Sequence, residues 1–204
     1  MNIEYQGGAN FEAFQTDFFK STLNTISAIN PVMIELGSND CHYSILFNKF
    51  FQNECTNICV ECSLNLLNLG KENAKNNNCN LIFEHAYVGE LDFDYINKFP
   101  NIFKDISKNQ TSIKSLKDKY NLSKIDMLHM DIQGSEILFI EELACEDVII
   151  EYVFVSTHKE SSFGSTHDFV KNKLTSMDYS LLFDNPTQGG YGDGLIVARK
   201  NIKE

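Results

Sequence analysis

Two short stretches of the sequence constrain the fold most strongly: MIELGSND at residues 33–40 and IDMLHMDIQGSE at residues 125–136. In each stretch, a run of mainly apolar residues ends on an acidic residue and is then broken by a glycine. This pattern is typical of a buried parallel strand that carries polar side chains to the edge of an α/β sheet. Open α/β sheets bind ligands at that edge, so both stretches are predicted to border a binding site.

Further apolar runs alternate with segments of helical periodicity, which predicts a parallel α/β sheet. Strands are expected at residues 32–36, 57–61, 81–88, 125–130, 148–156, 179–183 and 195–198. Helices are expected at residues 10–29, from about residue 42, and at 64–75, 112–121, 134–143 and 166–177. Residues 91–110 show no clear period and are expected to be irregular. The last two strands are joined by one loop without a helix, so they should pair antiparallel.

The size of the chain suits a single domain. Its 204 residues are 43% hydrophobic, which is enough to bury a sizeable core, and the sequence shows no internal repeat or linker. We expect one domain over residues 1–204, with an N-terminal helical cap at 1–30 and the core of the fold at 31–204. The six cysteines are irregularly spaced and are expected to be mostly small buried hydrophobes in a reducing compartment.

The charge of the chain narrows the class of partner. The formal net charge is −11 and no cluster of lysine and arginine stands out, whereas binding to a nucleic-acid backbone usually needs a basic face. No apolar run approaches the roughly 20 residues that span a bilayer, and the N-terminus lacks the features of a signal peptide. We therefore expect a cytoplasmic protein that acts on a small molecule and has neither nucleic acid nor membrane as a partner.

Acidic residues end three of the predicted strands. Glu35 precedes Gly37, which allows a tight turn with free amide groups, and a carboxylate there suits a positively charged ligand. Glu61 follows roughly 20 residues later, where α/β nucleotide folds place an acid on the ribose hydroxyls. Asp131 ends the fourth strand, and Glu136 falls in the first turn of the next helix, where the helix dipole favours a carboxylate.

Together these blocks resemble an FkbM-type methyltransferase from residue 32 to about residue 200. IELGSNDCHYS is similar to the glycine motif of that family, CVECS to its ribose-binding motif, HAYVG to its third strand, and IDMLHMDIQGSE to its most distinctive block. VSTHKE, after the fifth strand, is also similar to the family pattern. The resemblance implies S-adenosylmethionine as cofactor and a three-layer Rossmann-like fold with a seven-stranded, mostly parallel sheet whose last strand is antiparallel. It also implies O-methylation of a hydroxyl on a sugar, a surface glycan or a secondary metabolite.

The resemblance further implies the residues of the site. Glu35, Gly37, Ser38 and Asn39 would hold the methionine part of the cofactor, Glu61 the ribose, and Cys62, Ala86 and Tyr87 the adenine, with Asp131 beside the sulfonium and the acceptor. Three positions depart from the family pattern. Cys41 replaces a glycine and narrows the loop, Gln133 replaces an acid, and His129 replaces a basic residue. Cys41 and Gln133 keep open a second function, that of a non-catalytic cofactor-binding or assembly protein with a degenerate fold.

Methyl transfer to an alcohol needs a base within hydrogen-bond reach of the hydroxyl. Asp131 and His158 are the candidates, because both follow strands at the same edge and an imidazole can take a proton near neutral pH. His167 is a second choice, and His129 is expected to be a core histidine with satisfied polar atoms. A divalent metal held by Asp131, His158 and a nearby acid is an alternative way to polarise the hydroxyl, but no dense ligand cluster is visible and no metal is predicted.

Three cysteines offer a remote alternative. Cys55, Cys59 and Cys62 have the CxxxCxxC spacing of radical S-adenosylmethionine enzymes, in which three thiolates hold an iron–sulfur cluster. Cys59 and Cys62, however, lie at an odd offset around an apolar strand, so they should point to opposite faces. Glu61 also stands where that motif has an aromatic residue. The identity of the methyl acceptor and the oligomeric state correspond to no motif in the sequence.

Overall fold

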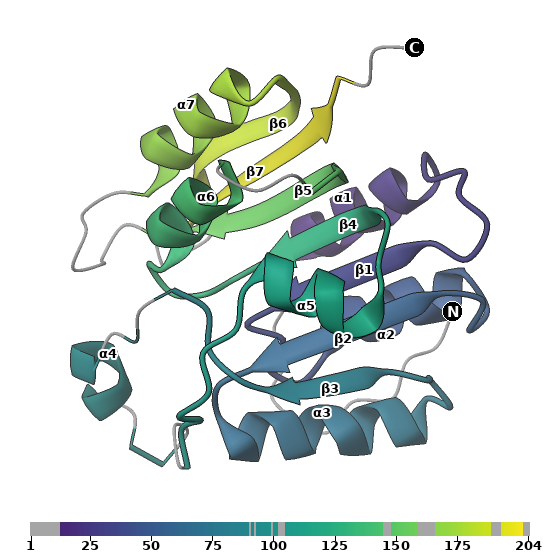
Figure 1. Cartoon of the computed structure of the whole chain (residues 1–204), viewed down its shortest axis with the longest axis vertical. Coiled ribbons are helices and arrows are strands. Elements are labelled where there is room, and N and C mark those ends of the chain that lie inside the picture. Colours follow the sequence, from purple (N-terminus) through teal and green to yellow (C-terminus); the bar gives the residue numbers. More distant parts are fainter. Residues whose placement is uncertain are drawn as a thin grey trace.

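The computed structural model of the chain describes residues 13–89, 91, 93–98, 100–101, 105–144, 148–158, 166–188 and 193–201. They contain a seven-stranded sheet in the order β3-β2-β1-β4-β5-β7-β6 (Figure 1). The strands are β1 (Val32–Leu36), β2 (Thr56–Glu61), β3 (Ile82–His85), β4 (Ile125–Met130), β5 (Ile150–Thr157), β6 (Tyr179–Gln188) and β7 (Asp193–Lys200). Strands β1 to β5 pair in parallel, and β7 pairs antiparallel with both β5 and β6.

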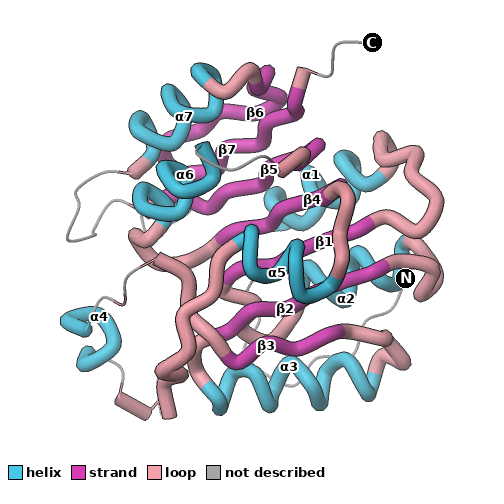
Figure 2. Tube along the Cα trace, viewed as in Figure 1, coloured by secondary structure: helices cyan, strands magenta, loops and turns pink. Residues whose placement is uncertain are grey.

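Helices cover both faces of this sheet and complete three layers (Figure 2). One face carries α1 (Ala13–Leu23), α2 (His42–Phe50) and α3 (Leu64–Asn76), and the other carries α5 (Ile113–Tyr120), α6 (Glu136–Ala144) and α7 (His167–Ser176). The short helix α4 (Phe93–Lys98) lies apart from the sheet. The predicted fold class, a three-layer and mostly parallel seven-stranded sheet with an antiparallel last strand, is confirmed.

Side chains that alternate along each strand build a separate core on each face of the sheet. On β1, Ile34 packs in one core with Phe139 of α6, while Met33 packs in the other core with Phe19 of α1. Because the central strands are buried on both faces, most of their residues are apolar, and this is why their positions can be predicted from the sequence. Polar side chains are left to gather where the strands end.

Some predicted boundaries are wrong. Helix α1 ends at Leu23 and does not continue to residue 29, because the side chains of Asn24 and Thr25 donate hydrogen bonds to carbonyls of its last turn. Ile29 is 93% exposed and so belongs to no apolar helix face. Residues 10–12 of that prediction lie outside the described residues. Helix α4 falls within the segment predicted to be irregular, and β6 and β7 extend their antiparallel pairing beyond the predicted ends.

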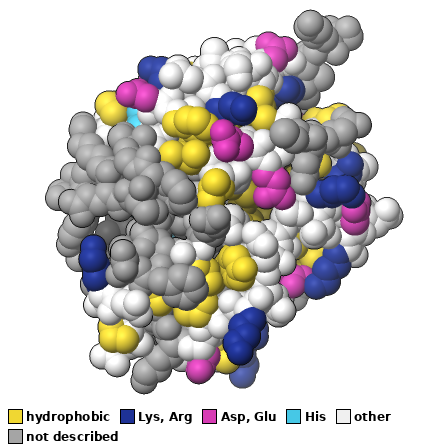
Figure 3. Space-filling view, turned by 60° about the vertical axis from the view of Figure 1, so that its left-hand side comes forward, with side chains coloured by type: hydrophobic (Ala, Val, Ile, Leu, Met, Phe, Trp, Pro, Cys, Tyr) yellow, Lys and Arg dark blue, Asp and Glu magenta, His cyan; other side chains and the backbone are white. Residues whose placement is uncertain are grey.

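The apolar helices of the described residues are short. Within the described residues, no helix is both long and apolar enough to cross a membrane. Figure 3 shows the side of the molecule on which α4 lies, and the lysine and arginine side chains coloured there lie at separate places with aspartate and glutamate among them. The five cysteines of the described ranges are free thiols, of which Cys41 and Cys59 are buried and the others half-buried.

The turn between β1 and α2 contains a cysteine in a backbone conformation that favours glycine. Cys41 directly precedes α2 with φ of 66°, in the left-handed region. Its buried thiol occupies space that Gly70 of α3 leaves open, since a Cβ atom added to Gly70 would lie 2.5 Å from Cys41 Sγ. A glycine on the neighbouring helix therefore accommodates the Cys41 side chain.

We expect the effect of Gly70→Ala on stability to depend on residue 41. In the wild-type protein the added methyl group collides with the Cys41 thiol and should lower the free energy of unfolding by about 1–3 kcal/mol. In the Cys41→Gly background the same substitution should lower it by much less, because the added methyl group then meets only the Asn39 carbonyl, at 3.3 Å, and alanine forms helix better than glycine. Urea denaturation of the four proteins measures this coupling. Equal effects in both backgrounds would contradict the packing of Cys41 against Gly70.

Candidate active site

The loops that follow β1 and β4 meet at the carboxyl edge of the sheet. Gly37 has φ of +72°, and a Cβ atom on it would lie only 1.9 Å from the carbonyl oxygen of Asp131. The amide of Asp131 in turn donates to the carbonyl of Leu36 at 3.0 Å. Because only glycine tolerates so close an approach between two backbones, Gly37 fixes the two sequence stretches against each other.

The loop after β1 is tied to the end of β2. The amides of Gly37 and Ser38 both donate to the carbonyl of Val60, at 2.9 and 3.0 Å, and the amide of Asn39 donates to Oε2 of Glu61 at 2.9 Å. The prediction of free amide groups at this turn is wrong, because the neighbouring strand accepts them. The loop is instead a rigid support that holds Glu61 in place.

Glu61 ends β2 with its side chain almost enclosed, since only 4% of the residue is exposed. Its Oε2 accepts the Asn39 amide, and its Oε1 accepts the amide of Ser63 at 2.8 Å. Burial raises the pKa of Glu61, while these two amide donors oppose the rise. A carboxylate oxygen that accepts one hydrogen bond keeps a lone pair, so Glu61 can still accept from the hydroxyls of a ligand.

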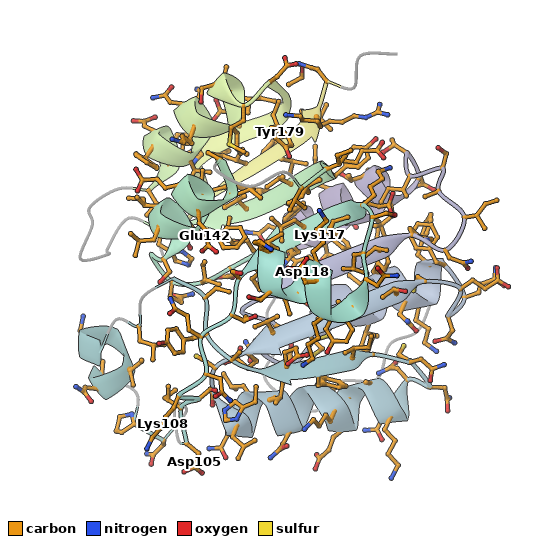
Figure 4. The ribbon with its side chains drawn as sticks, in the orientation of Figure 1. Asp105, Lys108, Lys117, Asp118, Glu142 and Tyr179 are labelled. Atoms are coloured by element: carbon orange, nitrogen blue, oxygen red, sulfur yellow. The ribbon has the colours of Figure 1, made fainter. Side chains whose placement is uncertain are left out.

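The three residues predicted to flank an adenine lie along the next part of this edge. Ala86 is buried, whereas Cys62 and Tyr87 are half-buried. Residues 105–111 run beside them: the amide of Ser107 donates to the Cys62 carbonyl at 2.8 Å, and that of Tyr87 donates to this segment at 3.0 Å. Figure 4 labels two residues of the segment, Asp105 and Lys108. Sequence analysis missed Ser107 because no periodicity or motif marks its surroundings.

Glu35 lies below the edge, inside the molecule. One carboxyl oxygen accepts the amide of Ser44 at 3.0 Å and also the Ser44 hydroxyl, and the other lies 3.7 Å from Nδ1 of His129. Burial raises the pKa of Glu35 to about 8, against the effect of the Ser44 donors. Glu35 is therefore mainly a neutral carboxylic acid at pH 7, and not the carboxylate that the sequence predicts.

His129 is a core histidine whose polar atoms are unpaired. Its ring packs against those of Tyr43 and Phe154, with centroids 4.1 and 5.2 Å away. Neither ring nitrogen has a hydrogen-bond partner among the described residues, and burial lowers the pKa of His129 to about 3. The expectation that its polar atoms are satisfied is wrong, because helix α2 and the neighbouring strand β5 supply aromatic rings at this point.

The two candidate bases form a linked group with a second acid. His158 follows β5, and its Nε2 lies 3.2 Å from Oδ1 of Asp131, at the end of β4. Its Nδ1 lies 2.7 Å from Oε1 of Glu136, in the first turn of α6. The Glu136 side chain is fully buried, whereas the Asp131 side chain is 39% exposed. Asp131 is therefore the member of the group that a ligand can reach.

The charges within this group place a proton on the histidine. Burial alone would lower the pKa of His158, but interactions with Asp131 and Glu136 outweigh it and raise the pKa to about 11. Burial likewise works to raise the pKa of Asp131, but His158, His129 and Gln133 bring it below its ordinary value. At neutral pH an imidazolium thus lies between two carboxylates and has no lone pair to offer to a proton or a metal ion.

Two further residues hold this arrangement. Gln133, with φ of 53°, donates from Nε2 to Oδ1 of Asp131 at 3.1 Å, where an acid would repel the carboxylate. Thr166, before α7, accepts the amide of His158 at 3.0 Å through its hydroxyl, and its own amide donates to the His158 carbonyl at 3.2 Å. Gln133 and Thr166 therefore fix Asp131 and His158 in orientation.

The ligand sets that a metal or a cluster would need are not formed in the part of the chain that the structure describes. No group of three or more histidine, cysteine, aspartate or glutamate side chains there is arranged to hold a metal ion. Cys59 is buried with Cys41 and Ile45, whereas Cys62 is half-buried beside the carboxyl edge. The CxxxCxxC spacing therefore does not bring its three thiols together.

The fold is that of Rossmann-like methyltransferases. TrmK from M. capricolum, solved with S-adenosyl-homocysteine, aligns with a TM-score of 0.56 at 13% identity over 90% of this chain and 68% of that chain. A precorrin-6y C5,15-methyltransferase from Geobacter metallireducens aligns with a TM-score of 0.59 at 13% identity over 97% and 93%. A putative O-methyltransferase from Klebsiella pneumoniae aligns with a TM-score of 0.62 at 10% identity over 96% and 84%. At these identities the likeness shows the fold alone.

A family model narrows this class. The methyltransferase FkbM domain matches residues 7–181, which is more than half of the chain. The chain belongs to the FkbM methyltransferase domain family, a class of S-adenosylmethionine-dependent enzymes, as its motifs predict. No curated protein matches the sequence at a significant level.

Glu35→Gln tests the protonation of the buried acid. Between about pH 4.5 and pH 8 the folded chain keeps a proton on Glu35 that the unfolded chain has lost, so this group makes the free energy of unfolding fall as pH rises. Glutamine cannot ionise, so relative to wild type the variant should gain a few kcal/mol between pH 5 and pH 8. Urea denaturation of both proteins at the two pH values measures this difference. A loss of stability that is equal at both would show an ionised Glu35.

Proposed function

We propose that this chain is an O-methyltransferase that moves the methyl group of S-adenosylmethionine to a neutral hydroxyl of a sugar, surface glycan or secondary metabolite. The observation that carries the proposal is Asp131, an accessible carboxylate kept ionised by His158 beside the turn at Gly37. An alcohol becomes a good nucleophile only as its proton leaves, and a carboxylate within reach can accept that proton. The family supports methyl transfer, and Asp131 together with the sequence resemblance supports a hydroxyl acceptor.

The residues of the carboxyl edge fit this cofactor. Glu61 keeps lone pairs for two ribose hydroxyls, and Asp40 Oδ1 is buried without a hydrogen-bond partner among the described residues, which suits an ammonium group. Gly37, Ser38 and Asn39 form the turn toward the methionine part, with Glu35 buried below it, and Cys62, Ala86 and Tyr87 lie on the adenine side. When bound, S-adenosylmethionine supplies a methyl group on a positively charged sulfur, which the acids of this edge attract.

Asp131 is the base in this proposal, and His158 orients it. Gln133 and His158 both engage Oδ1, which leaves Oδ2 for the acceptor hydroxyl. His158 already carries a proton at neutral pH, so it does not take one from the acceptor. The rest of the rate enhancement comes from holding the acceptor in line with the methyl group, since alignment of two reactants is worth about 7–11 kcal/mol.

Two of the three departures from the family pattern, Cys41 and Gln133, fit an active enzyme better than a degenerate one. Cys41 occupies the space beside Gly70 and leaves the turn at Gly37 in a glycine-like path. Gln133 donates a hydrogen bond to Asp131 and so supports its charge. Both contacts weigh against the alternative of a non-catalytic cofactor-binding protein.

Asp131→Asn tests the assignment of the base. We expect transfer of labelled methyl from S-adenosylmethionine to a panel of sugars and small alcohols to fall by about 10²–10⁴-fold, because the amide cannot accept the proton. Calorimetry should show cofactor binding close to that of the wild type. Asp118→Asn, on the exposed surface of α5 (Figure 4), is the matched control and should keep full activity.

Two results would contradict the proposal. Tight binding of S-adenosylmethionine by the wild type without methylation of any hydroxyl in the panel would favour the non-catalytic binder. Undiminished turnover in Asp131→Asn would remove Asp131 from the role of base.

A further inference from the structure

We propose that Glu136 is a positioning residue that acts through His158 to hold Asp131 ionised and aimed at the acceptor. The role of Asp131 in this inference rests on the proposed function. The link from Glu136 to His158 rests on the distances and burial of the two side chains. The sequence gives no sign of this link, because the two residues come from different elements of the fold.

Glu136 differs from an ordinary acid at the start of a helix. Such an acid usually stabilises the helix dipole from the surface, whereas the Glu136 side chain is wholly buried. Its Oε1 lies 2.7 Å from His158 Nδ1, and its Oε2 has no hydrogen-bond partner among the described residues. A buried carboxylate with so few donors is costly unless its partner is a cation. The contact therefore calls for a charged imidazolium at His158.

His158 is fixed in an orientation that favours its protonated form, because both ring nitrogens lie near carboxylate oxygens. Thr166 holds the backbone of His158 on both its amide and its carbonyl side. Each ring nitrogen faces a carboxylate oxygen, one of Glu136 and one of Asp131. A neutral imidazole that donates from Nδ1 to Glu136 would set the lone pair of Nε2 against Asp131, with which Nε2 is in ion-pair contact at 3.2 Å without a hydrogen bond, whereas an imidazolium places its positive charge between both carboxylates.

The charged groups around His158 come from two elements. Asp131 faces it from the end of β4, and Glu136 faces it from α6. On α7, His167 is bonded instead to Asp184 and to a threonine hydroxyl of β5. Among the described residues, two charged groups therefore face His158. Asp131 takes part in the proposed reaction, whereas Glu136 does not.

Loss of the Glu136 charge should affect Asp131 through a change in the protonation of His158. Without Glu136 the imidazolium has one carboxylate in place of two, so His158 gives up its proton at lower pH. At a pH above that lowered pKa, Asp131 loses its cationic neighbour. A carboxylate that a charged His158 no longer holds is aimed less well at the acceptor, and this lowers kcat at those pH values while cofactor binding is retained.

Histidine side-chain NMR across a pH titration tests the inference without relying on activity. Glu136→Gln removes the charge and keeps the shape, and the His158 signal is identified by its loss in His158→Gln. We expect wild-type His158 to stay protonated up to about pH 9 and its pKa to fall by about 1–3 in Glu136→Gln. Glu141→Gln, an exposed position on the same helix, should leave it unchanged. In methyl-transfer assays, kcat of Glu136→Gln should fall relative to wild type as pH rises through the lowered pKa of His158, with KM for S-adenosylmethionine retained.

The outcomes separate this inference from the proposed function. A wild-type His158 that titrates near its ordinary pKa of 6.5 would overturn the inference, and that measurement decides even if Glu136→Gln fails to fold. A His158 pKa that is the same in Glu136→Gln and wild type would also overturn it. If the pKa falls as expected but no protein transfers a methyl group, the link between Glu136 and His158 is supported and the proposed function alone is overturned.

Discussion

The approach of the Gly37 backbone to the carbonyl of Asp131 is the constraint on which the rest of the site depends. It brings the loop after β1 against the end of β4, so that polar groups from distant parts of the sequence share one edge. The same loop donates amides to Val60 and to the Glu61 carboxylate, which joins the end of β2 to the pair. A side chain at residue 37 would push these strand ends apart and separate the groups proposed to bind the cofactor from the proposed base.

The site keeps its acids in different states by giving them different neighbours. Glu35 is buried beside the neutral His129 and holds its proton, whereas Glu61 receives two backbone amides. Asp131 is paired with the His158 imidazolium and stays ionised where a ligand can reach it. These acids therefore supply one accessible negative charge, which suits a reaction that brings together a cationic sulfur and a neutral hydroxyl.

Much of the fold follows from local sequence, but contacts between elements do not. The central strands were predictable because burial on both faces makes them mostly apolar. The turn at Gly37 was predictable because glycine is the residue that readily adopts the positive φ observed there. The sequence did not reveal that strand β2 accepts hydrogen bonds from the amides of that turn, or that His129 lies among aromatic rings. Nor did it reveal that Glu136 meets His158. Each of these features depends on residues brought together only by the packing of separate elements, and no periodicity encodes such packing.

A crystal structure of the protein with S-adenosyl-homocysteine is the most direct test of the account. The account predicts the ribose hydroxyls within hydrogen-bond distance of Glu61, the adenine beside Ala86, and the sulfur on the side of the pocket that Asp131 faces. The turn at Gly37 should keep its present path, because its amides are already bonded to β2. A ligand bound elsewhere, with the edge between Glu61 and Asp131 left empty, would contradict the central claim.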